Sequence, residues 1–539
     1  MSEKLSRSGQ SPGYKIYVQR LLEVLVDRPY RFILENVIKG HLSKWLVYAV
    51  YGLAVAYLVF LASSIQPDIF YSGDAGLKFI IVKQIHSGEG FKYLTLHQPA
   101  WVQEIWNKGF FPLNKPFLYP SPQGYLFSFP PAFEVVSAFF YGKLGNAGLY
   151  VIPIASTLLL WIWVGVLLYK SGTSLNKIAL AIFILVFCSP LTIYGATYWE
   201  HMPMVLLLFS GIAFIVNPPE NAWIGAVMGA ICGLAVWLRP EALSMNIFYA
   251  LTIVFSNYKE KQSSKRGFLI MLLAITLVFF AFNKEVYGSF FGLHGYQIFQ
   301  DHTFWYKILR GFKFGWVLNW MLVQIFPFCL LIVFILYRWV IHHKAPDRVI
   351  QNLLLSTMAF SILTPAFFPN AGGGQWGPRY FLPLIPPMVV ILALTDERTI
   401  TKAIKRSVWG YYGLMLALII YSLYLNVFIG GQIKLRERYS DRITPALNYV
   451  KQQKEQVIVV NSDFIPMEMG AIFNEKNFFL AENNRELNEL IPLLKQQGQE
   501  RFLYISDKDE TPGPPNLLLT SQTGYVKKGI YFITEYTIE

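Results

Sequence analysis

Residues 45–78 read WLVYAVYGLAVAYLVFLASSIQPDIFYSGDAGLK and contain the change of character that decides the fold. The first 20 of them carry no charged side chain, and about 20 apolar residues are what a helix needs to cross the hydrocarbon core of a bilayer. The chain then turns polar, and Asp74 stands between two glycines with Lys78 one helical turn further on. We therefore expect a membrane helix that leads into a polar segment at the membrane surface.

The apolar character extends over most of the 539 residues. Hydrophobic residues make up 54% of the chain and charged residues 15%, and the mean hydropathy is +0.39, which is too apolar for a soluble protein of this size. The net charge of +13 lies in the apolar part, because residues 431–539 hold 13 Lys and Arg against 15 Asp and Glu. This distribution indicates topology signals at a bilayer, so the bilayer is the expected partner and nucleic acid is not.

Eleven apolar runs qualify as membrane spans. They begin near Trp45, Leu149, Ile178, Met202, Trp223, Leu243, Phe268, Trp316, Leu353, Phe381 and Tyr411. The short Lys- and Arg-rich loops all fall on one side of this arrangement, and by the positive-inside rule that side is cytoplasmic. The run FPPAFEVVSAFFYGKLG at 129–145 is short and begins with two prolines, so we assign it to an interfacial helix instead of a further span.

The predicted fold class is an all-α polytopic membrane protein with a small C-terminal α/β domain. Residues 1–44 form a cytoplasmic or interfacial segment, and residues 45–430 form the transmembrane domain, whose long outer loop covers 66–148. The odd number of spans places residues 431–539 on the extracytoplasmic side. In that region the short apolar strands EQVIVV and RFLYIS alternate with helical segments, which is typical of an α/β domain.

Ionisable residues gather at the outer ends of the spans. They are Asp74, Lys78, Glu200, His201, Arg239, Glu241 and Arg379. Each of these residues can also be explained by a purely structural role, since an Asp can cap a helix and an Arg is favourable at a helix C-terminus. Arg239 and Glu241 are two residues apart around a proline and do not face each other on a helix, so we expect each to face another partner or a ligand. Acids beside arginines at a lipid–water boundary suit an anionic lipid headgroup and the deprotonation of a hydroxyl.

A glycine-rich stretch, GGGQWGPR at 372–379, adds a recognition pattern. Glycines let a backbone approach a ligand closely, Trp376 offers a flat face of the kind sugars use, and Arg379 can grip a phosphate with two hydrogen bonds. The competing reading is a Trp and an Arg that anchor a helix end in the interface. Further candidates for contacts with sugar or acceptor are His201, Glu241, Gln375, His294 and Tyr296.

Four motifs, in their order along the chain, resemble those of the GT-C-type integral-membrane glycosyltransferases. They are YSGDAGLK in the first outer loop, FPPAFEVVSAFFYGKLG ahead of the second span, YWEH after the third span and WGPRYFLPLIP late in the chain. That superfamily includes the protein O-mannosyltransferases and the bacterial aminoarabinose transferase. The protein O-mannosyltransferases typically have an adjacent Asp-Glu pair in the first loop, whereas Ala75 follows Asp74 here, and the small C-terminal α/β domain is unlike their inserted β-rich domain. These departures argue against a protein acceptor of that class, and the missing inserted domain favours a bacterial plasma membrane.

The resemblance implies an enzyme that transfers a sugar from a polyprenyl-phosphate-linked donor to an acceptor hydroxyl at the outer face of the membrane. It makes Asp74 the base that takes the proton from the acceptor hydroxyl and Glu200 the second acidic position. The departing phosphate is expected to be held by Arg379, Arg239 and Lys78. The acceptor (lipid, glycan or protein) stays open, as does a divalent metal ion at Asp74, Glu200 or His201. The alternatives are a polymerase or ligase of lipid-linked glycans and a secondary transporter.

Overall fold

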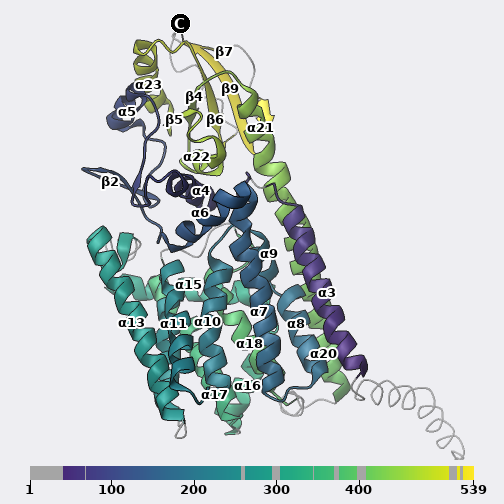
Figure 1. Ribbon diagram of the computed structural model, residues 1–539. Coiled ribbons are helices and arrows are strands. Elements are labelled where there is room, and N and C mark those ends of the chain that lie inside the picture. The colour runs from purple at the N-terminus through teal and green to yellow at the C-terminus, as the bar shows by residue number, and fades with distance from the viewer. Residues whose placement is uncertain are drawn as a thin grey trace, which may run out of the picture.

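The computed structural model describes residues 41–66, 68–256, 261–293, 304–343, 345–368, 375–396, 408–508, 519–521 and 526–538. Figure 1 shows two layers. One layer is a bundle of long helices. The other, which we call the cap, consists of the loop between α3 (His41–Ser63) and α7 (Val151–Lys170) together with the C-terminal α/β unit. The chain is thus a polytopic membrane protein with a small C-terminal sheet, and the predicted fold class is confirmed.

The bundle is made of apolar helices. After α3 and α7 their bounds are α8 Leu175–Phe187, α9 Leu191–Ala196, α10 His201–Val216, α11 Ala222–Leu238, α12 Ala242–Phe255, α13 Gln262–Tyr287, α15 Phe304–Ile325, α16 Cys329–His342, α17 Arg348–Leu363, α18 Ile385–Leu394 and α20 Val408–Leu423. Among the described residues, five helical segments are long and apolar enough to cross a membrane, one bent pair qualifies together, and five more apolar helices are shorter. Each of the predicted spans coincides with one of these segments.

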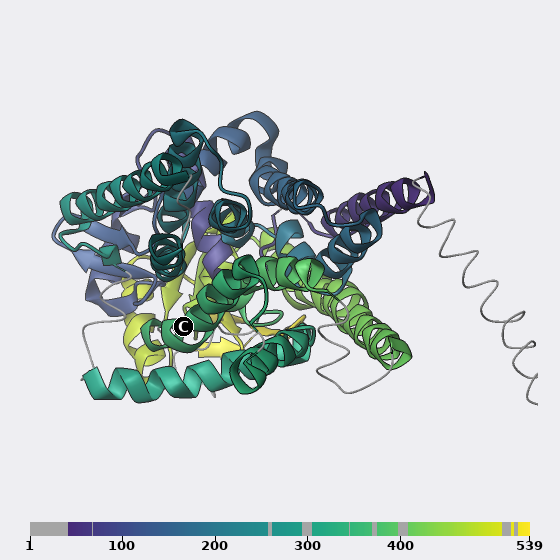
Figure 2. The same cartoon turned by 90° about the horizontal axis from the view of Figure 1, so that it is seen from below.

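The predicted single span near Trp316 is wrong in its shape. Helices α15 and α16 are bent by 114° relative to each other at a short break. The break contains Pro327, which has no amide hydrogen to donate and disfavours helical geometry in the residue before it. Figure 2 shows α15 lengthwise, whereas many bundle helices are viewed close to end on.

Small residues let two bundle helices approach closely. A Cβ at Gly229 of α11 would lie 2.1 Å from the carbonyl oxygen of Phe268 in α13, and a Cβ at Gly225 would lie 2.3 Å from that of Ser264. Helix association inside a bilayer depends on such backbone approach, because lipid tails are as apolar as leucine and no hydrophobic driving force acts between helices. The outward faces remain apolar, with Leu273 of α13 58% exposed.

The described part of the cap that precedes α7 contains three α-helices, the short helical turns η2 (Trp106–Phe110) and η3 (Gly145–Tyr150), and a small sheet. The helices are α4 Gly73–His86, α5 Ala100–Ile105 and α6 Ala132–Leu144, and the strands are β1 Tyr93–Leu94, β2 Leu118–Ser121 and β3 Gly124–Phe127. The strands pair antiparallel in the order β1-β3-β2. Helix α6 packs against α4 on one face and exposes Val136 and Phe139 on another, which fits the predicted interfacial helix.

The C-terminal unit is built around a six-stranded sheet. Its strands are β4 Val457–Val460, β5 Asn477–Leu480, β6 Arg501–Ser506, β7 Leu519–Ser521, β8 Val526–Lys528 and β9 Tyr531–Ile538, and its helices include α21 Thr444–Gln452, α22 Phe464–Glu468 and α23 Asn484–Gln496. The order is β5-β4-β6-β9-β7, with β8 on β9. Strands β5, β4 and β6 are parallel, and β9 is antiparallel to β6. The two predicted strands are β4 and β6, at the centre of the sheet.

One helical segment joins the two layers. Helix α20 continues through two π-helical stretches, η7 (Tyr424–Lys434) and η8 (Glu437–Ile443), into α21. Figure 1 shows this segment rising from the bundle along α3 into the cap. It passes the predicted domain boundary at 431 without a break, so the division of the chain at that residue stays a prediction.

Candidate functional site

Six charged side chains lie where the bundle meets the cap, and we call them the charged cluster. They are Asp74, Lys78, Glu200, Arg239, Glu241 and Arg379. All six were predicted as site residues, and they come from sequence positions up to 305 residues apart. The fold therefore brings the principal predicted residues into one continuous network of ion pairs and aromatic contacts.

Helix ends position this network. Asp74 lies in the first turn of α4, Glu200 and Glu241 stand at the N-caps of α10 and α12, and Arg239 is the C-cap of α11. A helix carries partial positive charge at its N-terminus and partial negative charge at its C-terminus, so each of these residues stands at the end that favours its charge. The same N-termini also favour an anionic ligand.

Asp74 and Arg379 form the accessible side of the cluster. Arg379 donates from Nη1 to Oδ2 of Asp74 at 3.1 Å, and Asp74 has the most exposed side chain of the six at 21%. The Nη2 of Arg379 donates to the Tyr380 hydroxyl at 3.3 Å. The Nε of Arg379 is buried and has no hydrogen-bond partner among the described residues. Arg379 therefore retains a donor for a ligand.

A second arginine approaches the same aromatic ring. The guanidinium of Arg379 lies 5.1 Å from the centre of the Tyr380 ring, and that of Arg239 lies 5.7 Å from it. Cations at this distance from a ring face are attracted by its quadrupole. Tyr380 thus helps to hold two like charges in one place, where their mutual repulsion would otherwise separate them.

Glu200 is the buried centre of the cluster. Its side chain is 5% exposed, and each carboxylate oxygen has its own cation. Lys78 pairs with Oε2, and Arg239 donates from Nη1 to Oε1 at 2.7 Å. A buried carboxylate needs such partners, because an unpaired charge in a poorly solvated site is costly. Glu200 is thus committed to holding Lys78 and Arg239.

The expectation that Arg239 and Glu241 do not face each other is wrong. Arg239 donates from Nε to Oε1 of Glu241. The rule for residues two apart applies within one helix, whereas here Arg239 ends α11 and Glu241 begins α12. The intervening turn at Pro240 brings the two side chains together.

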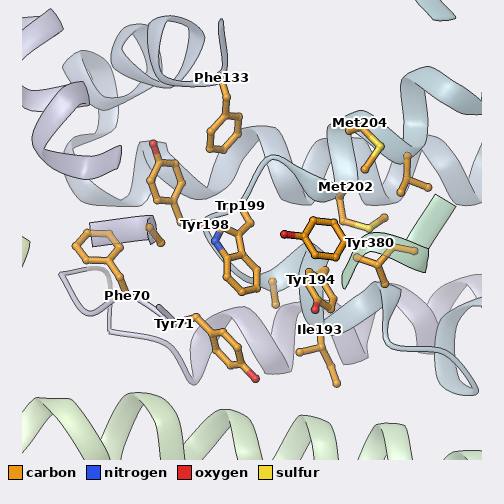
Figure 3. Close-up of a cluster of buried hydrophobic side chains, with 14 of the residues drawn as sticks. Phe70, Tyr71, Phe133, Ile193, Tyr194, Tyr198, Trp199, Met202, Met204 and Tyr380 are labelled. Carbon is orange, nitrogen blue, oxygen red and sulfur yellow. The ribbon is translucent and has the colours of Figure 1, made fainter. Parts of the chain in front are cut away.

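A layer of buried aromatic side chains adjoins the charged cluster. Figure 3 shows it, and its labelled members include Phe70, Tyr71, Phe133, Tyr194, Tyr198, Trp199 and Tyr380. Trp199 lies between Tyr71 and Tyr194, with ring centroids 5.4 and 5.3 Å away. Aromatic pairs at such distances contribute beyond the area they bury. The layer gives the residues before α4 and the start of α10 a firm common support.

His201 lies in this aromatic layer and not among ligating groups. It is fully buried, its ring centroid lies 5.0 Å from that of Trp199, and neither ring nitrogen has a hydrogen-bond partner among the described residues. Asp74 and Glu200 are paired with cations. Within the described part of the chain, no group of three or more His, Cys, Asp or Glu is arranged to hold a metal ion. These residues therefore do not form a fitting set of metal ligands.

The remaining predicted contacts are more scattered. Trp376 donates from its indole nitrogen to Oδ1 of Asn426 at 3.2 Å, so its ring packs against η7. Gln375 is half-buried, and its side-chain oxygen has no partner within the described ranges. Their roles toward a sugar stay predictions. His294, Tyr296 and the glycines at 372–374 lie outside the described residues.

Glu134 is a buried acid beside the charged cluster that the sequence analysis did not single out. It lies on α6, is 1% exposed, and neither carboxylate oxygen has a partner among the described residues. It is within electrostatic reach of Lys78 and Glu200. A lone acid in the apolar run FPPAFEVV was a usable signal, because a buried carboxylate is costly unless a partner or a ligand compensates it.

Comparison with solved structures identifies the fold. No family model and no curated protein matches this chain. The crystal structure of ArnT from Cupriavidus metallidurans bound to undecaprenyl phosphate matches with a TM-score of 0.51, and its apo structure with 0.50. Both matches have 11% sequence identity and cover 90% of this chain and 97% of ArnT. This chain shares its fold with ArnT.

The likeness to ArnT extends over both layers, since the bundle alone cannot supply 90% of the chain. At 11% identity it establishes the fold and no individual residue. The predicted fold class, a polytopic helical membrane protein with a small C-terminal α/β unit, is confirmed at that level.

Proposed function

We propose that this protein is a membrane glycosyltransferase that moves a sugar from a polyprenyl-phosphate carrier to an acceptor hydroxyl. The observation that carries the proposal is the charged cluster, with two arginines and an accessible carboxylate, in a fold shared with ArnT. ArnT is an aminoarabinose transferase, and one of its structures holds undecaprenyl phosphate. A lipid-linked donor is therefore the substrate class that the fold favours.

The reaction breaks the bond between the sugar C1 and the phosphate oxygen and forms a bond between C1 and the acceptor oxygen. The electron pair of the broken bond leaves with the phosphate, and the acceptor hydroxyl gives up its proton. We assign Asp74 as the base that takes this proton, because its carboxylate is the most exposed of the cluster and pairs with a single cation among the described residues. A positioned base of this kind contributes about 10²–10⁴-fold to the rate.

Arg379 and Arg239 are assigned to the leaving phosphate. Negative charge grows on the phosphate in the transition state, and fixed cations stabilise that state more than the ground state. Arg379 can act without leaving Asp74, because its Nε has no partner among the described residues. Lys78 and Glu200 hold the geometry, since their pair links α4 to α10 and fixes Arg239.

The proposed location is the extracytoplasmic side of a bacterial plasma membrane. Among the described residues, the Lys- and Arg-rich connections between α7 and α8 and between α16 and α17 lie at the end of the bundle away from the cap (Figure 1), and the positive-inside rule then favours the outer side for the cap. A polyprenyl tail would lie in the bilayer along the bundle, with its phosphate at the charged cluster. The acceptor, whether lipid, glycan or protein, is the unassigned partner.

The direct test is the discharge of a radiolabelled sugar from polyprenyl phosphate by purified protein. Wild type should transfer label from at least one such donor to a membrane-extract acceptor, and Asp74→Asn should lower the rate by about 10²–10⁴-fold. Asp68→Asn is the matched control. Asp68 belongs to the same loop, but it pairs with Lys451 at 2.5 Å, and both side chains are about one-third exposed.

The proposal fails if wild type discharges none of a panel of such donors. It also fails in its assignment of the base if Asp74→Asn retains the wild-type rate. Transfer of preassembled oligosaccharides instead of single sugars would move the assignment to a glycan ligase.

A further inference from the structure

The helix that carries Asp74 and Lys78 is held from behind by the C-terminal unit. A Cβ at Gly76 would lie 1.8 Å from the backbone oxygen of Met467, and one at Gly73 would lie 3.2 Å from the Met467 Cβ. The backbone of α4 thus rests directly on α22, the helix that contains Met467. Such an approach transmits any shift of that helix to the N-terminal turn of α4.

The side chain of Arg438 links the residues before α4 to α22. Arg438 of η8 donates from Nε to the carbonyl oxygen of Tyr71 at 2.6 Å and from Nη2 to Oε1 of Glu468 at 3.3 Å. Its guanidinium lies 5.7 Å from the centre of the Tyr71 ring. The carbonyl that it binds stands three residues before Asp74 and directly before Ser72, the N-cap of α4. Arg438 is therefore placed to fix the entry of the chain into this helix.

Glu468 is held in its turn by the sheet. The Tyr531 hydroxyl of β9 donates to Oε2 of Glu468, whose side chain is 5% exposed. Burial, and then the neighbouring Glu468 carboxylate, raises the pKa of Tyr531 well above its ordinary value, so the hydroxyl keeps its proton and remains a donor. The chain of contacts runs from β9 through α22 and η8 to the backbone before Asp74.

We propose that Arg438 is a positioning residue that sets the place of Asp74, with Glu468 and Tyr531 as its support. This inference rests on the proposed function for its effect on turnover. A planar guanidinium can bind two acceptors at fixed angles, whereas a lysine ammonium acts as a single point of charge. In this proposal the C-terminal unit positions Asp74, in addition to stabilising the fold.

The test compares Arg438→Gln, Arg438→Lys and Tyr531→Phe in the full chain. The matched control is Arg501→Gln, because Arg501 pairs with Glu535 at 3.7 Å in the same unit and its side chain is 54% exposed. Arg438→Gln should lower kcat by about 10²-fold, as expected for a misplacement of about 1 Å, with the donor KM changed by less than about threefold. Arg438→Lys should recover part of the loss, and Tyr531→Phe should show a smaller one.

Hydrogen exchange provides a readout that does not require sugar transfer. Amides of residues 73–80 should exchange at least about tenfold faster in Arg438→Gln than in wild type or Arg501→Gln, while those of α10 stay unchanged. This result supports the positioning role even if no donor is ever discharged. Wild-type exchange in α4 would overturn the inference, and so would a uniform increase across the bundle. Tyr531→Phe, which removes one hydroxyl, serves if Arg438→Gln does not fold.

Discussion

Asp74 and Glu200 are both acids of the charged cluster, but their surroundings give them different chemistry. Both carboxylate oxygens of Glu200 form ion pairs with buried cations, whereas one oxygen of Asp74 pairs with Arg379 and the Asp74 side chain is 21% exposed. A carboxylate enclosed by two cations is a poor proton acceptor, because protonation would leave both cations uncompensated. Under the proposed function, this difference favours Asp74 as the proton acceptor and Glu200 as the residue that positions the cations.

The substitution Glu200→Gln should destabilise the protein more than it alters any ligand contact. It removes one member of a buried ion network, which costs about 3–5 kcal/mol when the partners stay behind. The measurement is the free energy of unfolding in detergent, followed by tryptophan fluorescence. Glu437→Gln is the control, since its pair with Lys434 is about half-exposed and such pairs contribute about 1 kcal/mol or less. Equal losses for the two variants would contradict the network.

At the residue scale, the sequence predicted the members of the charged cluster but not their pairing. Their place at the outer ends of the predicted spans was enough to single them out. Pairing depends on how helix ends meet, which is why the contact between Arg239 and Glu241 was missed. Arg438 gave no such signal, because it lies among several charges in a polar segment and its partners are 30 or more residues away.

Helix α4 is the element on which the site depends most. It carries Asp74 and Lys78 on adjacent turns, contacts α6 and rests on Met467 through Gly76. The glycine is required by distance, because a methyl group at this position would overlap the Met467 carbonyl.

Gly76→Ala should therefore displace α4 and lower sugar transfer by about 10²-fold, the effect of a misplacement of about 1 Å. The control is Gly52→Ala in α3, where a Cβ would meet no heavy atom within 4 Å. That change should be neutral or stabilise by up to about 1 kcal/mol, because alanine favours a helix. The measurement compares the sugar-transfer rates and unfolding temperatures of the two variants. A fully active Gly76→Ala would contradict the close contact between α4 and Met467.

At the scale of elements, continuous apolar runs predicted helices and strands well, whereas short or partly polar strands were not predicted. Eleven runs became apolar helical segments, and EQVIVV and RFLYIS became the central strands β4 and β6. The bend at Pro327 was missed, because hydropathy alone does not distinguish a straight span from a broken one. Strands β5 and β7 to β9 were missed: β5, β7 and β8 are three or four residues long, too short to show a period, and polar residues interrupt β9.

The two parts of the cap form one structural unit through several contacts. Trp106 donates from its indole nitrogen to the carbonyl oxygen of Phe478 at 2.8 Å, and Gln98 donates to that of Phe473 at 3.2 Å. Both donors belong to the loop before α7 and both acceptors to the C-terminal unit. Together with the packing of α4 on Met467, these contacts hold the two parts of the cap against each other.

The cap should therefore unfold as a whole. Limited proteolysis along a temperature ramp, read by mass spectrometry, should show cleavage in 73–127 and in 444–508 at the same temperature. Trp106→Phe removes one buried hydrogen bond at a cost of about 1 kcal/mol and should lower both temperatures together. Cleavage of the C-terminal unit while 73–127 remains intact would show two separate units.

The central claim is that the charged cluster binds the phosphate of a polyprenyl carrier. The most direct measurement is equilibrium binding of undecaprenyl phosphate to detergent-purified wild type, Arg379→Gln and the surface control Arg485→Gln, whose side chain is 89% exposed. Loss of a charge-assisted contact of about 1.5–3 kcal/mol predicts an affinity about 10–150-fold weaker for Arg379→Gln and an unchanged one for the control. Equal affinity in all three proteins, or no binding by wild type, would contradict the account.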